Sequence, residues 1–380
     1  MKDLFHRLLD YYSITEDDFK ELNKDVNPQS FINTYRFNNV KDAVTLVKDS
    51  MSKGLKIHIY GDYDADGIMG TSILAKMFQY LNYEATYYIP NRYKDGYGIN
   101  MVKAKEIVDN GIGLLICVDN GVSAVEPIAY CREHGVDVLV LDHHEVPETI
   151  PNANVILHPF LSKLSEFSTS GASVAFLFSV YMLRGFDKYL STLASISIIS
   201  DMMPLKGYNR DLLRIVFPRY VDGEFYQIDL LKGDDPFDEN SIGMSIAPKI
   251  NSVGRIVEDY SVSDIVKYFI SNDKEEILTY FNWINNLNTQ RKEASKISND
   301  SSLDIDDSDA SNVVLVDEKE GLIGLIANRL MNEPTSPRRT AAVQSVPGSP
   351  ARCDSCPIFS RRVIRDSASS MRDSMSWVMS

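Results

Sequence analysis

The sequence has 380 residues and a formal net charge of −14, from 39 Lys and Arg against 53 Asp and Glu. This length is sufficient for about two domains. The negative charge argues against a protein that coats nucleic acid or an acidic membrane surface along its whole length. The sequence shows neither an apolar run long enough to span a bilayer nor the pattern of a secretory signal, so we expect a cytoplasmic protein with no membrane partner.

The predicted elements change in character near residue 55. Residues 1–54 are predicted to form a helical N-terminal segment of short amphipathic helices. Beyond them, short β-branched runs alternate with helical segments, which is typical of βαβ units and of a parallel sheet with both faces covered. We therefore predict an α/β fold, with a catalytic domain over residues 55–225 and a mostly helical connector over residues 226–300.

The C-terminal part is expected to contain a second unit that breaks off. Residues 301–333 include a strand followed by a helical segment and predict the start of a second α/β domain. Residues 334–380 contain eleven Ser but no Lys or Glu, a composition unlike that of the preceding chain. We predict that this tail is disordered and of different origin, and we derive no function from it.

Acidic and histidine side chains directly follow three strands of the predicted sheet. Because the carboxyl ends of parallel strands meet at one edge, where ligands bind, we expect these side chains to form a single site. A further aspartate ends a later apolar segment and is expected to close the site from a helix end. The residues are Asp62, Asp64 and Asp66 after IHIYG, Asp119 after LLICV, Asp142, His143 and His144 after VDVLVL, and Asp201 after LASISIIS.

This mixture of carboxylate and imidazole groups suits two divalent cations. Both Mn²⁺ and Mg²⁺ accept such ligands, and the histidine content favours Mn²⁺. Two ions sharing Asp66 or Asp119 would hold a bridging hydroxide for attack on phosphorus. Adjacent residues of an extended segment face opposite ways, so we predict His143 as a ligand. His144 is then expected to hydrogen-bond a substrate phosphate or to support the metal ligands.

Each part of this pattern has a simpler interpretation when taken alone. The residues from Asp62 to Gly67 also fit the opening of an EF-hand calcium loop, but Ile73 stands where that loop needs a bidentate Glu. A lone aspartate such as Asp119 is more often a helix cap or a turn former than a ligand. The Asp-His-His triplet fits a hydrogen-bonded turn about as well as a metal site. Only their joint occurrence at three strand ends favours a metal centre.

Seven stretches of the chain resemble, in order, motifs of the DHH phosphoesterase superfamily and, within it, of the RecJ-like single-strand-specific exonucleases. The resemblance implies metal-binding roles for Asp62, Asp64, Asp66, Asp119, His143 and Asp201, with His144 as the second histidine of the motif. The stretches are GDYDADGIMG (61–70), YYIPNRYKDGYGIN (87–100), VDNGVSA (118–124), LDHHEVP (141–147), GASVAF (171–176), ISDMMPL (199–205) and PKINSVGR (248–255).

The same resemblance implies a phosphate-binding set. The segment PNRYKDGYG is similar to one that separates RecJ-like nucleases from pyrophosphatases of the superfamily, and it offers Arg92. The segment NSVGR adds Asn251 and Arg255. Arginine matches phosphate oxygens in a bidentate fork, so the two arginines are expected to hold a 5′ end. Taken alone, Arg255 would more commonly form a surface ion pair.

The chain departs from this family in its C-terminal part. The segment GLIGLIANRL (321–330) resembles the opening of the second domain, called DHHA1, but Lys319 stands where these proteins usually have His. The Gly-Gly-His segment that should follow is replaced by the tail. The DHHA1 domain normally helps to hold nucleic acid, so the resemblance describes a nuclease truncated in its second domain.

The resulting hypothesis is a metal-dependent hydrolase that degrades single-stranded DNA from its 5′ end to 5′-mononucleotides, a DNA repair and recombination activity. A single-strand-binding protein or a helicase is a possible partner. Two alternatives stay open: a phosphodiesterase for oligonucleotides, cyclic dinucleotides or polyphosphate, and a truncated non-catalytic scaffold.

Overall fold

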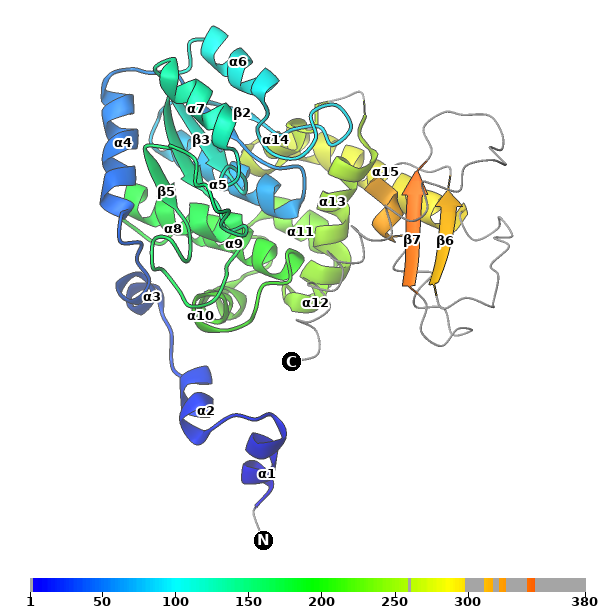
Figure 1. Cartoon of the computed structure of the whole chain (residues 1–380). Helices are drawn as coiled ribbons and strands as arrows, with labels where there is room; N and C mark the ends of the chain where they lie inside the picture. Colours follow the sequence, from blue (N-terminus) through cyan, green and yellow to red (C-terminus); the bar gives the residue numbers. More distant parts are fainter. Residues whose placement is uncertain (1–2, 259–260, 298–310, 317–320, 326–339, 346–380) are drawn as a thin grey trace. The chain divides into compact units, whose positions relative to one another are not determined.

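The computed structural model divides the chain into two compact units, residues 1–285 and 286–380. In the first unit a parallel sheet is packed between helices (Figure 1). Among the described residues, no helix combines the length and apolar character needed to cross a bilayer. The structure describes residues 3–258, 261–297, 311–316, 321–325 and 340–345.

The sheet of the first unit has five parallel strands in the order β2-β1-β3-β4-β5. This arrangement confirms the predicted α/β fold with a parallel sheet. The chain passes from β1 outward to β2 and then crosses back to β3, so the order reverses between β1 and β3. The strands are β1 (Ile57–Tyr60), β2 (Ala85–Tyr88), β3 (Leu114–Val118), β4 (Asp137–Leu141) and β5 (Val155–Leu157).

Burial explains the composition of the strands. The central strand β3 is buried along its whole length and is continuously apolar, as expected when helices cover both faces of a sheet. In β1 the side chains alternate: Ile57 and Ile59 are completely buried, whereas His58 is only partly covered. Thr86 in the edge strand β2 is exposed, so the sheet is less well covered near this edge.

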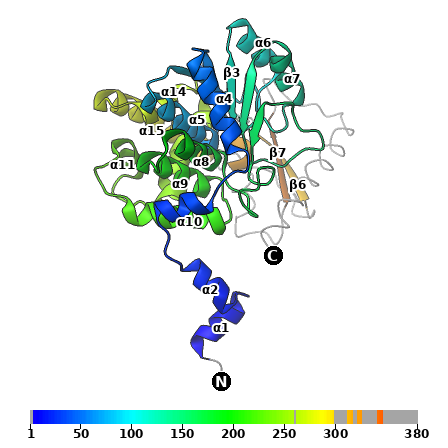
Figure 2. The ribbon, with the colours of Figure 1, turned by 90° about the vertical axis from the view of Figure 1, so that its left-hand side faces the viewer.

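Helices form a layer on each face of the sheet (Figure 2). Helices α6 and α7 pack on one face through an apolar cluster that includes Tyr60, Leu115 and Val138. Helices α5 and α8 contact β3 from the other face, and α4 contacts β5. These helices are α4 (Val40–Ser52), α5 (Ala65–Tyr80), α6 (Met101–Asp109), α7 (Val125–Glu133) and α8 (Gly171–Leu183).

Further helices extend the layer that contains α5. Helix α9 packs against both α5 and α8, and α13 and α14 also contact α5. The π-helix η2 leads directly into α13. The elements are α9 (Lys188–Ser200), α10 (Gly207–Val216), η1 (Phe217–Arg219), α11 (Tyr226–Lys232), α12 (Glu239–Ser241), η2 (Ile242–Ile246), α13 (Ala247–Ile256), α14 (Asp264–Ile270) and α15 (Lys274–Ile297).

The N-terminal residues form three short helices before α4. Side-chain caps start each of them: Asp3, Thr15 and Asn27 accept hydrogen bonds from backbone N–H groups of the first turns. Thr15 and Asn27 also complete capping boxes. The helices are α1 (Leu4–Tyr11), α2 (Glu16–Leu22) and α3 (Pro28–Thr34).

The described part of the second unit contains a parallel strand pair, β6 (Ser311–Val316) and β7 (Thr340–Ser345). β7 lies inside the segment that we predicted to be disordered, so the structure differs from the prediction at these six residues. Its sequence, TAAVQS, contains β-branched Thr and Val, which a strand accommodates well. The other residues of 334–380, and the predictions for 301–310 and 326–333, lie outside the described residues.

Candidate metal and phosphate site

The site lies at the carboxyl edge of the sheet, where the strand order reverses between β1 and β3. The loop after β1 and the first turn of α5 supply Asp62, Asp64 and Asp66. Asp64 is the N-cap of α5, and its Oδ1 accepts hydrogen bonds from the backbone N of Asp66 at 2.9 Å and of Gly67 at 3.1 Å. The cap therefore fixes the path of the loop that carries the three aspartates from β1 into α5.

The Asp66 carboxylate is anchored by a second helix. Its Oδ2 accepts a hydrogen bond from Gly171 N at 2.7 Å, and its Oδ1 accepts one from Ala172 N at 2.7 Å. Both amides belong to the first turn of α8, whose N-terminal dipole favours a negative charge. The hydroxyl of Ser197 in α9 also donates to Oδ1 at 2.5 Å. Asp66 is thus held by the two helices that close the site.

Asp119 follows β3 in a left-handed backbone conformation, with φ of 60°. Non-glycine residues adopt this conformation infrequently. The backbone N of Asp119 donates to Leu141 O of β4 at 2.9 Å, which holds the residue at the strand end. The next residue, Asn120, donates through Nδ2 to Gly61 O at 3.0 Å and to Val118 O at 2.9 Å, and so ties the ends of β1 and β3 together.

His143 is the point at which carboxylates from three parts of the chain meet. Its Nε2 lies 3.0 Å from Asp119 Oδ1, 3.4 Å from Asp66 Oδ2 and 3.7 Å from Asp201 Oδ2. The side chain of His143 is only 9% exposed. Asp201 comes from the C-terminal end of α9, where the helix dipole disfavours a carboxylate unless a cation is near.

The crowding of the carboxylates makes their ionisation difficult. Burial, together with the charge of Asp64, raises the pKa of Asp62 to about 8. Burial and the charge of Asp66 raise the pKa of Asp201 to about 8. The pKa of Asp119 is raised well above its usual value, again by burial first and then by the neighbouring aspartates. Burial also lowers the pKa of His143 and so favours the neutral imidazole that a metal ion requires.

Unpaired polar atoms gather in this site. Within the described ranges, seven buried side-chain atoms lack a hydrogen-bond partner, and three of them are carboxylate oxygens of the cluster. These oxygens are Asp62 Oδ1, Asp119 Oδ1 and Asp201 Oδ2. Buried carboxylate oxygens without a hydrogen bond are costly, and a neutral imidazole beside Asp119 and Asp201 does not neutralise their charge, so the cluster favours a bound cation. The donor set therefore fits divalent metal.

The ligand atoms form three overlapping groups that are each compact enough to hold an ion. Within each group the candidate atoms lie within 4.8 Å of one another. Asp119 and His143 each belong to two groups, but a neutral imidazole binds one ion, so the carboxylate of Asp119 is the bridging candidate. Together the groups include all six predicted metal ligands and also His144. They are Asp62–Asp64–Asp119, Asp66–His143–Asp201 and Asp119–His143–His144.

Asp142 orients the two histidines. Its Oδ1 accepts hydrogen bonds from the backbone N of His143 at 2.7 Å and of His144 at 3.2 Å, and it lies 2.8 Å from His144 Nδ1. Its Oδ2 accepts from Val122 N at 2.8 Å. Burial opposes ionisation of Asp142, but the hydrogen bond and charge of His144 outweigh it and lower the pKa to about 2. Asp142 is therefore a positioning residue.

His144 faces a different environment from His143. Its side chain is 42% exposed, and its Nε2 lies 3.0 Å from Tyr97 Oη. Burial lowers its pKa, but the hydrogen bond and charge of Asp142 overcome this effect and raise the pKa to about 8. An imidazolium in this position can donate a hydrogen bond to an anionic ligand. The two histidines thus differ in exposure and partners, although their rings lie 4.5 Å apart and both belong to one ligand group with Asp119, so the separate roles predicted for them stay a prediction.

The phosphate-binding candidates lie on segments that contact the β1–α5 loop. The guanidinium carbon of Arg92, in the loop after β2, lies 4.1 Å from the centre of the Tyr63 ring. The charge of Arg92 opposes the net rise in the pKa of Asp62. Asn251 Oδ1 in α13 accepts a hydrogen bond from Ala65 N at 2.8 Å. Arg255 lies one helical turn further along α13. Asn251 therefore has a structural contact that its predicted role did not include.

Two glycines allow the segments of the site to approach closely. A Cβ atom at Gly171 would lie 2.7 Å from the Cβ and Oδ1 of Asp119. A Cβ atom at Gly254 would lie 2.2 Å from the backbone oxygen of Tyr63. Real Cβ atoms do not come this near to other heavy atoms, so α8 and α13 could not pack in these positions with alanine.

Some functional residues were missed at the sequence level. Ser197, Asn120 and Tyr97 hydrogen-bond within the site, yet no role was assigned to them. Ser197 had a detectable signal, because it stands four residues before Asp201 on the same face of a helix. Tyr97 and Asn120 lie inside the quoted motifs, but only the three-dimensional structure shows their partners.

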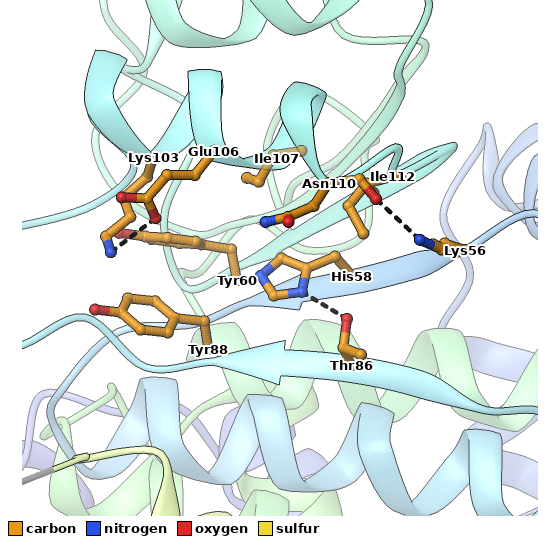
Figure 3. Close-up of a pocket in the computed structure, with 10 residues that line it drawn as sticks. All are labelled: Lys56, His58, Tyr60, Thr86, Tyr88, Lys103, Glu106, Ile107, Asn110 and Ile112. Atoms are coloured by element: carbon orange, nitrogen blue, oxygen red, sulfur yellow. Dashed lines mark hydrogen bonds and ion pairs between the residues drawn. The ribbon is translucent and has the colours of Figure 1, made fainter.

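A cavity of about 420 Å³ lies elsewhere, on the sheet face beside α6 (Figure 3). It has none of the clustered carboxylates of the sheet edge. Lys103 pairs with Glu106 at 3.0 Å, and Lys56 donates to Asn110 O at 3.1 Å, so these charges have partners within the protein. The lining residues are Lys56, His58, Tyr60, Thr86, Tyr88, Lys103, Glu106, Ile107, Asn110 and Ile112.

Comparison with known proteins finds similarity in the central part of the chain. Residues 56–200 match the model of the DHH family, N-terminal domain. The chain is also similar to the single-stranded-DNA-specific exonuclease RecJ of Bacillus subtilis, with 30% identity over 314 residues, 80% of this chain and 40% of that protein. RecJ of Haemophilus influenzae is 30% identical over 312 residues, 76% of this chain and 53% of that protein.

A solved structure supports the same relationship. The crystal structure of an exonuclease RecJ bound to manganese superposes with a TM-score of 0.73 and 25% identity, covering 87% of this chain and 86% of that chain. The chain spans about half the length of the curated relatives it matches.

Proposed function

We propose, on the premise that residues 56–200 are a DHH-family N-terminal domain, that this chain is a metal-dependent phosphodiesterase of the RecJ type. Its substrate would be single-stranded DNA, hydrolysed from the 5′ end to 5′-mononucleotides. The observation that carries the proposal is the set of buried carboxylates at the sheet edge: Asp62 Oδ1, Asp119 Oδ1 and Asp201 Oδ2 have no hydrogen-bond partner, and the last two lie beside the imidazole of His143. The similarity to RecJ exonucleases, one of them bound to manganese, supports both the substrate and the cofactor.

The proposed metal ligands are the members of the three overlapping groups other than His144. Asp119 would be shared between neighbouring ions, His143 would bind one of them, and Asp66 would be held in place by the N-terminus of α8. Two ions, Mn²⁺ or Mg²⁺, would supply an activated water for attack on phosphorus and would neutralise the charge of the transition state. The full ligand set is Asp62, Asp64, Asp66, Asp119, His143 and Asp201.

The remaining residues would orient the substrate. Asp142 accepts a hydrogen bond from His144 Nδ1 and raises the pKa of His144, so the ring can be an imidazolium whose Nε2 donates toward a phosphate oxygen or toward Tyr97 Oη. Arg92 and Arg255 would bind the 5′ phosphate, with the side-chain amide of Asn251 as a further donor. Since Asn251 also holds the first residue of α5, it would link phosphate binding to the position of the aspartates.

We further propose single-stranded DNA as the macromolecular partner, together with a single-strand-binding protein or a helicase, and a cytoplasmic location. The alternative substrates are short oligonucleotides, cyclic dinucleotides and polyphosphate. A dinucleotide and a strand of about 30 nucleotides distinguish these classes, because only a long-strand nuclease gains from extended stacking and phosphate contacts. The scaffold alternative requires that divalent metal have no effect on thermal stability.

The direct test is hydrolysis of a 5′-phosphorylated single strand by the purified chain with Mn²⁺. We expect 5′-mononucleotides as products, with a duplex of the same sequence resistant. Asp64→Ala and His143→Ala should abolish turnover. Asp137→Ala is the matched control, because Asp137 begins β4 at the opposite end of the strand and pairs with Arg132. Absence of Mn²⁺-dependent cleavage, or full activity of His143→Ala, would refute the proposal.

A further inference from the structure

Tyr63 occupies an unexplained place in the acidic motif. It lies between Asp62 and Asp64, yet its ring lies against the guanidinium of Arg92, 4.1 Å from ring centre to guanidinium carbon. Arg92 Nε is buried and has no hydrogen-bond partner within the described residues. The contact with the ring orients the guanidinium, but its Nε–H donates no hydrogen bond. Such a group is expected to bind an anion that accepts this hydrogen bond.

Tyr63 is itself held by α13. A Cβ atom at Gly254 would lie 2.2 Å from the backbone oxygen of Tyr63, so helix and loop are in direct contact. Two residues away, Ala65 N donates to Asn251 Oδ1 at 2.8 Å. The backbone on both sides of Tyr63, which carries the ring that supports Arg92, is therefore held against α13.

The loop that carries Arg92 is tied to the same helix. Tyr93 Oη donates to Arg255 O at 2.5 Å, and Asn91 Nδ2 donates to Val257 O at 3.1 Å. The β1–α5 loop, the loop after β2 and α13 thus form a closed frame with contacts on all three sides. Within this frame, the contact between the side chains of Tyr63 and Arg92 joins the β1–α5 loop to the loop after β2.

From these contacts we infer that Tyr63 is a positioning residue that holds Arg92 ready for a terminal phosphate of the substrate. This inference rests on the proposed phosphodiesterase function. Preorganising the guanidinium reduces the entropy lost when it binds phosphate. The effect is confined to substrates that present the phosphate, so Tyr63 determines preference for a phosphorylated 5′ end.

The test compares Tyr63→Leu and Tyr63→Phe on single strands with a 5′ phosphate or a 5′ hydroxyl. We expect Tyr63→Leu to raise KM about tenfold for the phosphorylated strand, the scale of a lost cation–π contact. Its KM for the hydroxyl strand and its kcat should stay near those of the parent. Tyr63→Phe retains the ring and should retain the preference. Tyr130→Leu is the matched control, since the Tyr130 ring packs on His134 in the α7 region.

Binding without turnover provides a second readout. Fluorescence anisotropy in EDTA, with the same two oligonucleotides, should show the preference for phosphate in the parent chain and its loss in Tyr63→Leu. Adding Tyr63→Leu to Arg92→Gln should cause no further loss, because the two side chains act as a pair. The inference is overturned if Tyr63→Leu weakens both oligonucleotides equally, or if Tyr63→Phe behaves like Tyr63→Leu. A parent chain that binds with this preference but hydrolyses neither strand would refute the proposed function and leave the role of Tyr63 intact.

Discussion

Replacing Asp62 by Asn should stabilise the metal-free protein while weakening its response to metal. Asp62 is 3% exposed, and its Oδ1 has no hydrogen-bond partner. Burial and the charge of Asp64 raise its pKa from 3.8 to about 8. The folded protein therefore binds the proton of Asp62 more tightly than the unfolded chain does. The free energy of unfolding that this proton contributes is lost as the pH rises from 3.8 toward 8. Asparagine is neutral at every pH and avoids this loss.

The size of the effect follows from the pKa. Each unit of pKa difference corresponds to about 1.4 kcal/mol, so between pH 5 and pH 8 the wild-type protein should lose on the order of 4 kcal/mol through this group. For a domain of this size, that corresponds to a fall in Tm on the order of 10 °C. The fall for Asp62→Asn should be smaller by about this amount, because Asp119 and Asp201 keep raised pKa values and still contribute. Divalent metal should raise the Tm of the wild type more than that of the variant, because the variant lacks one ligand of the Asp62–Asp64–Asp119 group.

Thermal unfolding followed by circular dichroism, in EDTA at pH 5 and pH 8, measures this difference. The matched control is Asp211→Asn, because Asp211 is also buried but accepts a hydrogen bond from Tyr35 Oη at 2.8 Å and lies 3.4 Å from Lys24 Nζ. This variant should be destabilised at both pH values. If Asp62→Asn loses as much Tm as the wild type between pH 5 and pH 8, the electrostatic reasoning is wrong.

The affinity for Mn²⁺ should rise between pH 6 and pH 9 in isothermal titration calorimetry, because Asp62 and Asp201 must release protons with pKa values of about 8, and a flat profile would contradict this. Asp142→Asn should keep the fold but reduce kcat or Mn²⁺ affinity about 10- to 100-fold, as expected when a residue that orients a ligand is changed. A reduction below about twofold would contradict the positioning role of Asp142. Gly171→Ala should abolish metal binding, because its Cβ would lie 2.7 Å from Asp119. Gly185→Ala, where a Cβ meets nothing within 4 Å, is its control, and equal metal affinity in the two variants would refute the steric argument.

Much of the fold could be predicted because local patterns and burial agree. The apolar runs at β3 and β4 indicated buried parallel strands, and the polar residues at their ends indicated the site edge. The rule that ligands bind at the carboxyl edge was enough to bring Asp62, Asp119 and His143 together. Their convergence therefore did not require knowledge of helix packing.

Other features depend on tertiary contacts that sequence spacing does not encode. The role of Asn251 as a partner of Ala65 N depends on the packing of α13 against α5, nearly 190 residues away in the chain. The stacking of Tyr63 on Arg92 joins two loops whose relative position is set by β1 and β2. The strand at Thr340–Ser345 was missed because the serine-rich composition around it outweighed six residues of local β propensity.

The number of Mn²⁺ ions bound per chain tests the central claim most directly. Equilibrium dialysis followed by metal analysis should give two ions for the wild-type chain. Asp119→Asn should lose at least one of them, because Asp119 belongs to two of the three ligand groups. A wild-type chain that binds no Mn²⁺, or an Asp119→Asn variant that still binds two ions with the same affinity, would contradict the two-metal site at the sheet edge.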